Sequence, residues 1–406
     1  MTSPSTDGRL SFDTVLALAE RESGAYGGAD AGLLGRHRAM VEWINARGPY
    51  SVDQLAGMRR QLSRLLANRL RIALDRRRFP AIAAERIERP IFVVGLPRAG
   101  TTLLHSLLAE DPEVHAPRAW HSHVPSPPPG ATVVAEGRLA IAQRAIEQLI
   151  DFVPGLLPLH PYWDKGAQAL VEDEELFTLD LRNAYPTLLY RVPTLDVRVD
   201  ASGADVPATY AFHRELLQHL QWNTGRQRWA CKGVYHQFQL DALFQAYPDA
   251  LCVWPHRSMQ EIHASMVTIA AVLYDAITGG RIDWKQFARS TAEGFKAGLD
   301  YVMSTPLIDD PRVVHLRFSD IAADPIAAVR TVYDRGGLEL RDEYRQRMQA
   351  WLADPSNRAD RYGRYAYAHE PFGLTREWLG ELFADYHRRF GLVESSGRRP
   401  PALELS

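Results

Sequence analysis

The sequence predicts a three-layer α/β fold, in which a central parallel sheet has helices on both faces, with a helical extension before it. From residue 89 onwards, short β-branched runs alternate with longer helical patterns, which is typical of parallel strands joined by right-handed crossovers. Residues 9–88 show helical spacing alone. We therefore expect a helical extension packed on the main domain at 1–88, the α/β domain at 89–395 and a flexible tail at 396–406.

Within the extension, a stripe of leucine and methionine runs from Leu55 to Leu70 at helical spacing, with arginines around it. Because the arginines surround the stripe and do not form one polar face, we expect this helix to pack its leucines on the main domain. A peripheral contact with a membrane surface is the alternative.

The elements of the α/β domain follow in order along the chain. The expected strands cover 91–94, 114–118, 228–232, 250–255 and 312–318. The expected helices cover 141–157, 170–189, 210–222, 238–247, 326–334 and 379–390, and another begins at 256–258.

The composition limits the classes of partner. A formal net charge of −2 gives no overall attraction to nucleic acid, so any anion site must be locally basic. Two cysteines, Cys231 and Cys252, cannot build a disulfide framework and are typical of a reduced, cytoplasmic protein. There is no apolar run of about 18 residues, the length that a membrane-spanning helix needs. We expect no transmembrane segment and no nucleic-acid partner.

The first strand leads into a glycine loop, Gly95-x4-Gly100-Thr101-Thr102, and then a helix. Such a loop directs unpaired N–H groups and the positive end of a helix at a phosphate or sulfate. Its spacing is that of a Walker A loop, except that Thr101 replaces the lysine that would hold the β- and γ-phosphates of a nucleoside triphosphate. ATP or GTP hydrolysis is therefore disfavoured, and Arg98 is the substitute cation.

Basic side chains also follow the other strands, and ligands of a parallel sheet bind at the carboxyl ends of its strands. Lys232 and His236 follow one strand, Arg257 follows another, and His121 and His123 join them if their loop folds back. These residues predict a basic pocket in a mildly acidic protein.

Arg257 and Ser265 are eight positions apart, about 12 Å along a helix axis. They hold one phosphate only if Arg257 precedes the helix and folds back. Simpler interpretations make Ser265 an ordinary helix residue, Lys232 a surface residue and 172–175 a solvated acidic face.

Four segments together resemble bacterial sulfotransferases that use 3′-phosphoadenosine 5′-phosphosulfate (PAPS): GLPRAGTTLLHSLL, WACKGVYH, HRSMQEIHAS and HLRFSDIAADPIAAVRTVY. The resemblance implies a P-loop-like α/β fold, sulfuryl transfer to an acceptor hydroxyl and no metal. By matching position it places the 5′-phosphosulfate on the loop and the 3′-phosphate on Arg257 and Ser265. A C-terminal segment with Tyr367 and Phe372 resembles one that closes over the nucleotide. The loop residues are Arg98, Ala99, Gly100, Thr101 and Thr102.

Sulfuryl transfer needs a general base and groups that stabilise charge on the bridging oxygen. Arg98, Thr101 and Lys232 suit the second task. Relatives often carry glutamate directly after the tryptophan that matches Trp120, where this sequence has His121, so His121 is the expected base. The rivals for this role are His123, Glu174, Glu175 and His236.

Tryptophans and leucines around 125–159 indicate an apolar cleft, and hence a small-molecule hydroxyl acceptor of lipid, polyketide or aromatic type. Two other functions stay open. A kinase-like phosphotransferase would need a loop lysine and an aspartate for Mg²⁺, and a non-catalytic module would bind PAPS or a nucleotide without turnover.

Overall fold

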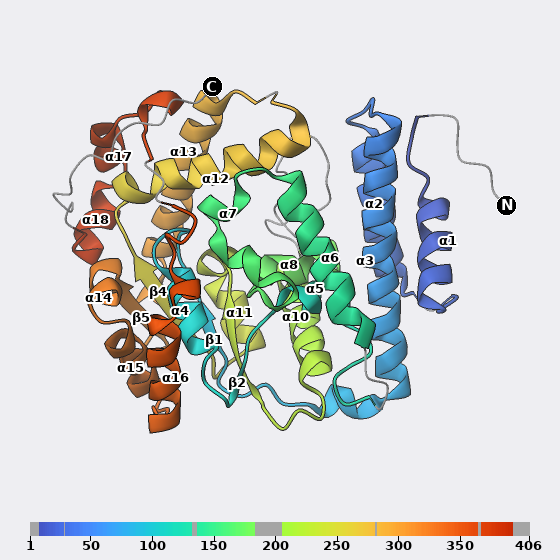
Figure 1. Ribbon diagram of the computed structural model, residues 1–406, viewed down its shortest axis with the longest axis horizontal. Coiled ribbons are helices and arrows are strands. Elements are labelled where there is room, and N and C mark those ends of the chain that lie inside the picture. Colours follow the sequence, from blue (N-terminus) through green and yellow to red (C-terminus); the bar gives the residue numbers. More distant parts are fainter. Residues whose placement is uncertain are drawn as a thin grey trace.

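The computed structural model describes residues 8–27, 29–131, 136–182, 205–280, 282–363 and 367–392. One sheet of parallel strands has the order β2-β3-β1-β4-β5 (Figure 1). The central strand, β1, places Phe92 opposite Cys231 of β3 and Cys252 of β4. The predicted parallel α/β fold is confirmed. The strands are β1 Ile91–Val93, β2 Val114–His115, β3 Arg228–Lys232, β4 Leu251–His256 and β5 Val313–Arg317.

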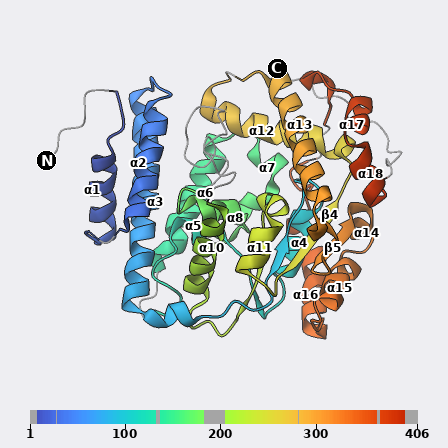
Figure 2. The ribbon, with the colours of Figure 1, turned by 180° about the vertical axis from the view of Figure 1, so that it is seen from behind.

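Helices cover both faces of the sheet (Figures 1 and 2). Because side chains alternate along a strand, Phe92 and Val94 face one apolar cluster, while Ile91 and Val93 face a second cluster. The first cluster includes α10 Val206–Gln221, α11 Leu240–Ala246 and α13 Trp284–Ser304, and the second includes α4 Thr101–Leu108, α15 Pro325–Arg335 and α16 Asp342–Ala353.

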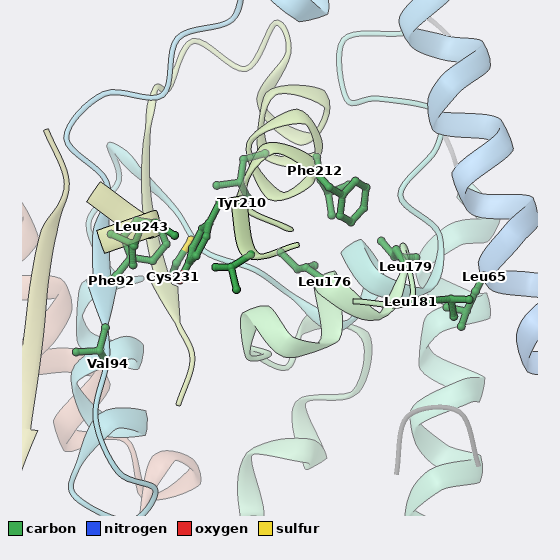
Figure 3. Packing of buried hydrophobic residues seen from close by; sticks show 14 of the residues in the cluster. Leu65, Phe92, Val94, Leu176, Leu179, Leu181, Tyr210, Phe212, Cys231 and Leu243 are labelled. Carbon is green, nitrogen blue, oxygen red and sulfur yellow. The ribbon is translucent and has the colours of Figure 1, made fainter. Parts of the chain in front are cut away.

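The extension consists of α1 Phe12–Ser23, α2 Ala31–Asn45 and α3 Val52–Arg78. Ser51 begins α3 with a capping box that includes Gln54, which satisfies exposed N–H groups of the first turn. The predicted leucine stripe of α3 is buried. Figure 3 shows that Leu65 lies beside Leu181, at one end of a packed cluster that continues to the sheet.

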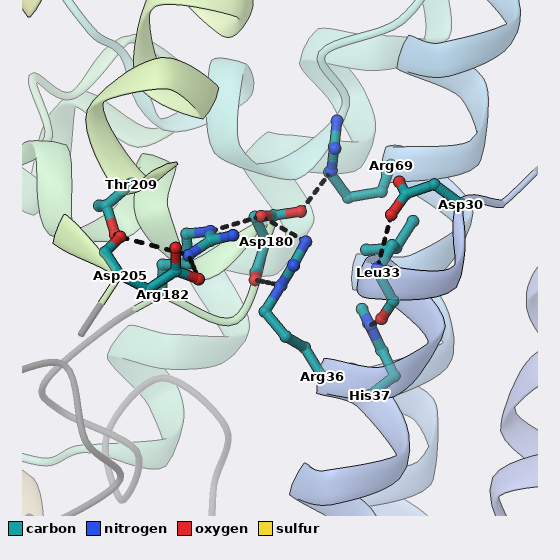
Figure 4. A network of polar contacts seen from close by, with 9 residues as sticks. All are labelled: Asp30, Leu33, Arg36, His37, Arg69, Asp180, Arg182, Asp205 and Thr209. Carbon is teal, nitrogen blue, oxygen red and sulfur yellow. Dashed lines mark hydrogen bonds and ion pairs between the residues drawn. The ribbon is translucent and has the colours of Figure 1, made fainter. Parts of the chain in front are cut away.

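A buried carboxylate also ties the extension to the main domain (Figure 4). Asp180 accepts hydrogen bonds at 2.7 Å from Arg36 of α2, Arg69 of α3 and its own neighbour Arg182. Burial opposes ionisation of Asp180, but Arg69 and Arg36 lower its pKa below the usual value. Because a buried charge is costly without partners, this contact makes the position of α2 and α3 specific.

The predicted helix 170–189 is wrong in its described part. Only α8, Asp173–Thr178, is helical, because Leu170 instead forms an antiparallel bridge with Arg118 and Glu172 is extended. The rest, 183–189, lies outside the described residues, as does the predicted tail 396–406. The predicted helix 141–157 begins earlier and is divided at Gly155.

Further segments surround the carboxyl ends of the strands. They are α5 Ala119–His123, α6 Glu136–Phe152, α7 Leu156–Leu159, η2 Pro161–Gln168, η3 Tyr235–Phe238, α12 Met259–Thr278, α14 Phe318–Ala323, η6 Glu370–Phe372, α17 Arg376–Leu382 and α18 Ala384–Phe390. Across the described ranges, no helix has both the length and the apolar character needed to cross a bilayer.

Candidate active site

The glycine loop has a backbone that ordinary residues rarely adopt. Gly95 and Gly100 have φ of +107° and +96°, and Arg98 between them has φ of +68°. A Cβ atom at Gly95 would lie 2.7 Å from Cδ1 of Trp254, so the loop needs glycine both for its φ and for its packing. No side chain caps α4, and its first residues, Thr101 and Thr102, line the cavity. The N–H groups of this first turn are therefore available as hydrogen-bond donors to an anion.

Two arginines flank this loop. The guanidinium of Arg98 donates to the carbonyl oxygen of Leu159 (3.3 Å), and that of Arg257 donates to the carbonyl oxygen of Arg98 (3.2 Å). Arg257 also pairs with Glu261 (2.7 Å) and stacks on Phe318, 4.1 Å from its centroid. Both arginines line the same cavity.

Arg257 and Ser265 were expected to hold one phosphate only if Arg257 precedes the helix and folds back, and the first part of this condition is met. Arg257 lies before α12, since Ser258 is the N-cap, whereas Ser265 lies within that helix. Ser265 is buried, and its hydroxyl has no hydrogen-bond partner among the residues that the structure describes. This hydroxyl is therefore a buried polar group that the described residues leave unsatisfied, although it does not line the cavity that Arg98 and Arg257 share.

Lys232 ends β3 and points to the glycine loop. Its ammonium donates to Oγ1 of Thr102 (3.4 Å) and pairs with Glu172 (2.8 Å), while only 6% of its side chain is exposed. Burial opposes ionisation of Glu172, but Lys232 outweighs it and lowers the pKa of Glu172. This buried cation therefore lies between the anion loop and a carboxylate.

Two more carboxyl groups follow Glu172 on the cavity wall. Glu174 accepts a hydrogen bond from the backbone N–H of Tyr235 (2.8 Å), and Glu175 lies 3.5 Å from the hydroxyl of Ser122. Burial, and then the charge of Glu172, raises the pKa of both Glu174 and Glu175 to about 8. At neutral pH these two groups are mostly protonated, whereas Glu172 is ionised.

One cavity of about 1070 Å³, just above the usual range for ligand sites, is lined by Arg98, Thr102, Lys232, Arg257 and the three glutamates, and Ser265 is not part of its lining. Away from the glycine loop the lining mixes apolar side chains with polar ones such as Arg60, Gln61 and Asn357, and it comes from several separate parts of the chain. The apolar side chains include Leu65 of α3, Ile141 and Leu149 of α6, Trp163 of η2, and Ile269 and Leu273 of α12.

Comparison with known proteins agrees with this geometry. The model of the sulfotransferase family matches residues 90–342. The chain belongs to the sulfotransferase family.

This sulfotransferase is similar to several mycobacterial sulfotransferases. It is 25% identical over 317 residues to omega-hydroxy-beta-dihydromenaquinone-9 sulfotransferase Stf3 of Mycobacterium bovis and of Mycobacterium tuberculosis, covering 73% of this chain and 74% of theirs. The crystal structure of STF9 from Mycobacterium avium matches with a TM-score of 0.80 at 24% identity, over 98% of this chain and 100% of the other. STF1 from Mycobacterium tuberculosis matches with a TM-score of 0.71 at 27% identity, over 93% and 99%.

Most of the predicted anion-binding residues of this sulfotransferase lie together. The cavity is lined by Arg98, Gly100, Thr101, Thr102, Lys232, Arg257 and Tyr367. Ala99 is fully buried behind the loop. Phe372 packs in a separate apolar cluster with Val267 and Ala288 and does not line this cavity.

The expected base, His121, lies elsewhere. It is buried and is not part of the described cavity wall, and its Nδ1 accepts the N–H of Arg118 (3.0 Å). Burial, and then Arg118, lowers its pKa well below the usual value. The short helix α5 directs His123 to the cavity and turns His121 to the core against Trp120 and Trp229.

The sequence did not single out Glu172. Its one signal is that it opens the acidic run directly after the apolar pair Leu170-Val171, and nothing in that pattern indicates a partner at Lys232, 60 positions later. His236 was a rival for the base, yet it is fully buried and bonds Asp173.

Proposed function

We propose that this sulfotransferase transfers the sulfuryl group of PAPS to the hydroxyl of an apolar lipid acceptor. The observation that carries the proposal is the placement of Lys232 between Thr102 of the glycine loop and Glu172 (3.4 and 2.8 Å) on the wall of a cavity that also has apolar side chains. The loop, a cation and a carboxylate are the three groups that the transfer needs at one point.

PAPS would use two anion sites. The N–H groups of 98–102 would hold the 5′-phosphosulfate, and Arg257 with the unpartnered hydroxyl of Ser265 would hold the 3′-phosphate. Tyr367 would contact the nucleotide, since it lines the same cavity. Thr101 in place of a lysine supports this donor over a nucleoside triphosphate.

In the reaction, the acceptor oxygen attacks sulfur while the bond from sulfur to the bridging phosphate oxygen breaks. Lys232 stabilises the negative charge that develops on that bridging oxygen. The proton of the acceptor hydroxyl passes to a carboxylate of the acidic run. We assign this role to Glu172, because it is the ionised member and lies against Lys232, whereas Glu174 and Glu175 hold protons at neutral pH.

The acceptor is assigned from the walls of the cavity. Side chains of α6 and α12 give part of it an apolar lining that suits a hydrocarbon chain or ring system. The name of the Stf3 relatives describes a hydroxylated menaquinone derivative as their acceptor. A long-chain or prenyl alcohol is therefore the acceptor class that we propose here.

The test combines binding with turnover. Thermal stability should rise with PAPS or with its desulfated product and not with ATP and Mg²⁺, because only the former have a 3′-phosphate. Mass spectrometry should then detect sulfated product from prenyl or long-chain alcohols. Stabilisation by ATP and Mg²⁺ alone would indicate a phosphotransferase, and binding without turnover on any alcohol would indicate a non-catalytic module.

A further inference from the structure

We propose that Asp173, a buried residue that does not line the cavity, positions the Lys232–Glu172 pair through a network of histidines and tyrosines. The inference rests on the proposed function, in which Lys232 and Glu172 act in the transfer. Asp173 touches neither substrate, so its role is positioning.

The network is fully enclosed. Oδ2 of Asp173 accepts from Nε2 of His236 (2.9 Å) and lies 3.3 Å from Nε2 of His213. Nδ1 of His236 meets the hydroxyl of Tyr210 (2.8 Å), and Nδ1 of His213 meets that of Tyr247 (2.9 Å). All five side chains are buried.

These distances fit one arrangement of protons. Where each tyrosine hydroxyl donates to an Nδ1 atom, the Nε2–H of His236 donates to the carboxylate, whereas Nε2 of His213 lies 3.3 Å from it without forming a hydrogen bond. Burial opposes the charge of Asp173, but His213 and His236 more than offset it and lower its pKa. A carboxylate is thus kept ionised in the core by its two histidine neighbours.

This network joins two segments that carry the reactive groups. The acidic segment, 172–175, and the lysine segment, 232–236, meet at Lys232–Glu172, His236–Asp173 and Tyr235–Glu174. A Cβ atom at Gly233 would lie 2.8 Å from Oε2 of Glu174, so the segments also approach closely there. Because Asp173 lies between Glu172 and Glu174 in the acidic segment, its contact with His236 also restrains the two glutamates that contact Lys232 and Tyr235.

Energetics favour a positioning role over a stabilising one. A buried charge is often replaceable by apolar side chains of similar volume without loss of stability, so Asp173 is weak evidence for stability alone. Its neighbours Glu172, Glu174 and Glu175 all face the cavity, whereas Asp173 faces away. The value of the buried carboxylate is therefore that it sets the direction of those three.

Two tyrosine variants provide a matched test. Tyr210→Phe and Tyr247→Phe each remove one buried hydroxyl from a histidine of the network. His236 belongs to the lysine segment, whereas His213 belongs to α10, which does not line the described cavity. We expect Tyr210→Phe to lower kcat about tenfold with KM for PAPS within about twofold, and Tyr247→Phe to leave kcat within about twofold.

Asp173→Asn gives the second readout. The substitution weakens the contact of position 173 with His236, so Lys232 holds Glu172 less closely. We expect the pKa of Glu172 in the bound complex to rise, which moves the acid limb of the kcat–pH profile to higher pH. A rise in thermal stability when the desulfated product is added shows that the variant is folded. If Asp173→Asn is unfolded, the same shift of the limb is sought in Tyr210→Phe.

The outcomes separate cleanly. Equal losses of kcat in both tyrosine variants, or an acid limb that does not move, would overturn the positioning role and leave the proposed function intact. One equivalent of zinc in the purified protein would also overturn it, since the potential metal ligands of Asp173, His213 and Cys231 lie within 4.8 Å of one another. Wild-type protein without sulfuryl transfer would instead overturn the proposed function itself.

Discussion

The glycine loop and the acidic segment face one cavity and are held in opposite ways. The loop is shaped by its own backbone, through positive φ at Gly95, Arg98 and Gly100. The acidic segment is held by side chains from strands and helices far along the chain, such as Lys232 and His236. The shape of the glycine loop therefore depends on a few local residues, whereas the arrangement of the acidic segment depends on contacts with distant parts of the fold.

The largest expected effect tests whether Glu172 of the acidic segment or His121 is the general base. Glu172→Gln should lower kcat by about 10²- to 10⁴-fold, because the amide cannot accept the proton of the acceptor. Glu175→Gln and His121→Gln serve as controls, with kcat expected within about tenfold of the wild type. Steady-state kinetics with saturating PAPS measure all three, and a large loss in His121→Gln alone would return the base to that residue.

The next effect concerns the loop side of the cavity. Arg257→Ala should raise the Kd of the desulfated product about 100-fold, because a charged hydrogen bond to the 3′-phosphate is lost. Isothermal titration calorimetry measures this change. Arg317→Ala is the matched control, since Arg317 is an exposed residue at the end of the neighbouring strand. Equal affinities for the two variants would remove Arg257 from the anion site.

A smaller effect tests whether the loop backbone is as specific as it looks. Gly95→Ala should lower the free energy of unfolding by about 2 kcal/mol or more, from strain at its φ of +107° and the overlap with Trp254. Gly294→Ala, in α13 with open space around it, should be neutral or stabilising. Chemical denaturation compares the two, and similar stabilities would show that the loop tolerates a side chain.

The smallest effect concerns pH. Glu174 and Glu175 have folded-state pKa values of about 8, above the ordinary 4.5 of the unfolded chain. The folded state therefore binds more protons between these values, and the stability that both groups contribute falls as pH rises from about 5 to 8. Thermal unfolding without ligand at pH 6 and pH 8 should show a smaller fall for Glu174→Gln or Glu175→Gln than for the wild type.

The difference between the two regions also explains what the sequence could predict. Gly95, Gly100, Lys232 and Arg257 were found because their signals are local: turn glycines, and cations directly after buried strands. All five strands were found for the same reason. The helix over 170–189 was wrong because an acidic run has helical propensity, while the bridge from Leu170 to Arg118 is a tertiary contact that propensity does not contain.

The orientation of His121 and the pairing of Glu172 with Lys232 also depend on tertiary contacts, so local sequence patterns could not predict them. A five-residue helix such as α5 has no long apolar stripe from which a buried face can be read. The helix α13 was overlooked, although Asp283 is a clear N-cap and Ala288, Ala292, Leu299 and Val302 form its buried stripe. That signal was present, because three- and four-residue spacings between apolar residues are the ordinary mark of a helix.

The contact of Asp180 with Arg36 and Arg69 has a practical consequence for anyone who shortens this chain. The family match begins at residue 90, so an expression fragment cut to those limits would lose both arginines and leave Asp180 with Arg182 alone. It would also lose Arg64 and Leu65, which form part of the cavity wall. The third helix, α3, is thus both an anchor of the extension and a part of the cavity wall, and a truncation series that removes it should lose solubility and acceptor binding together.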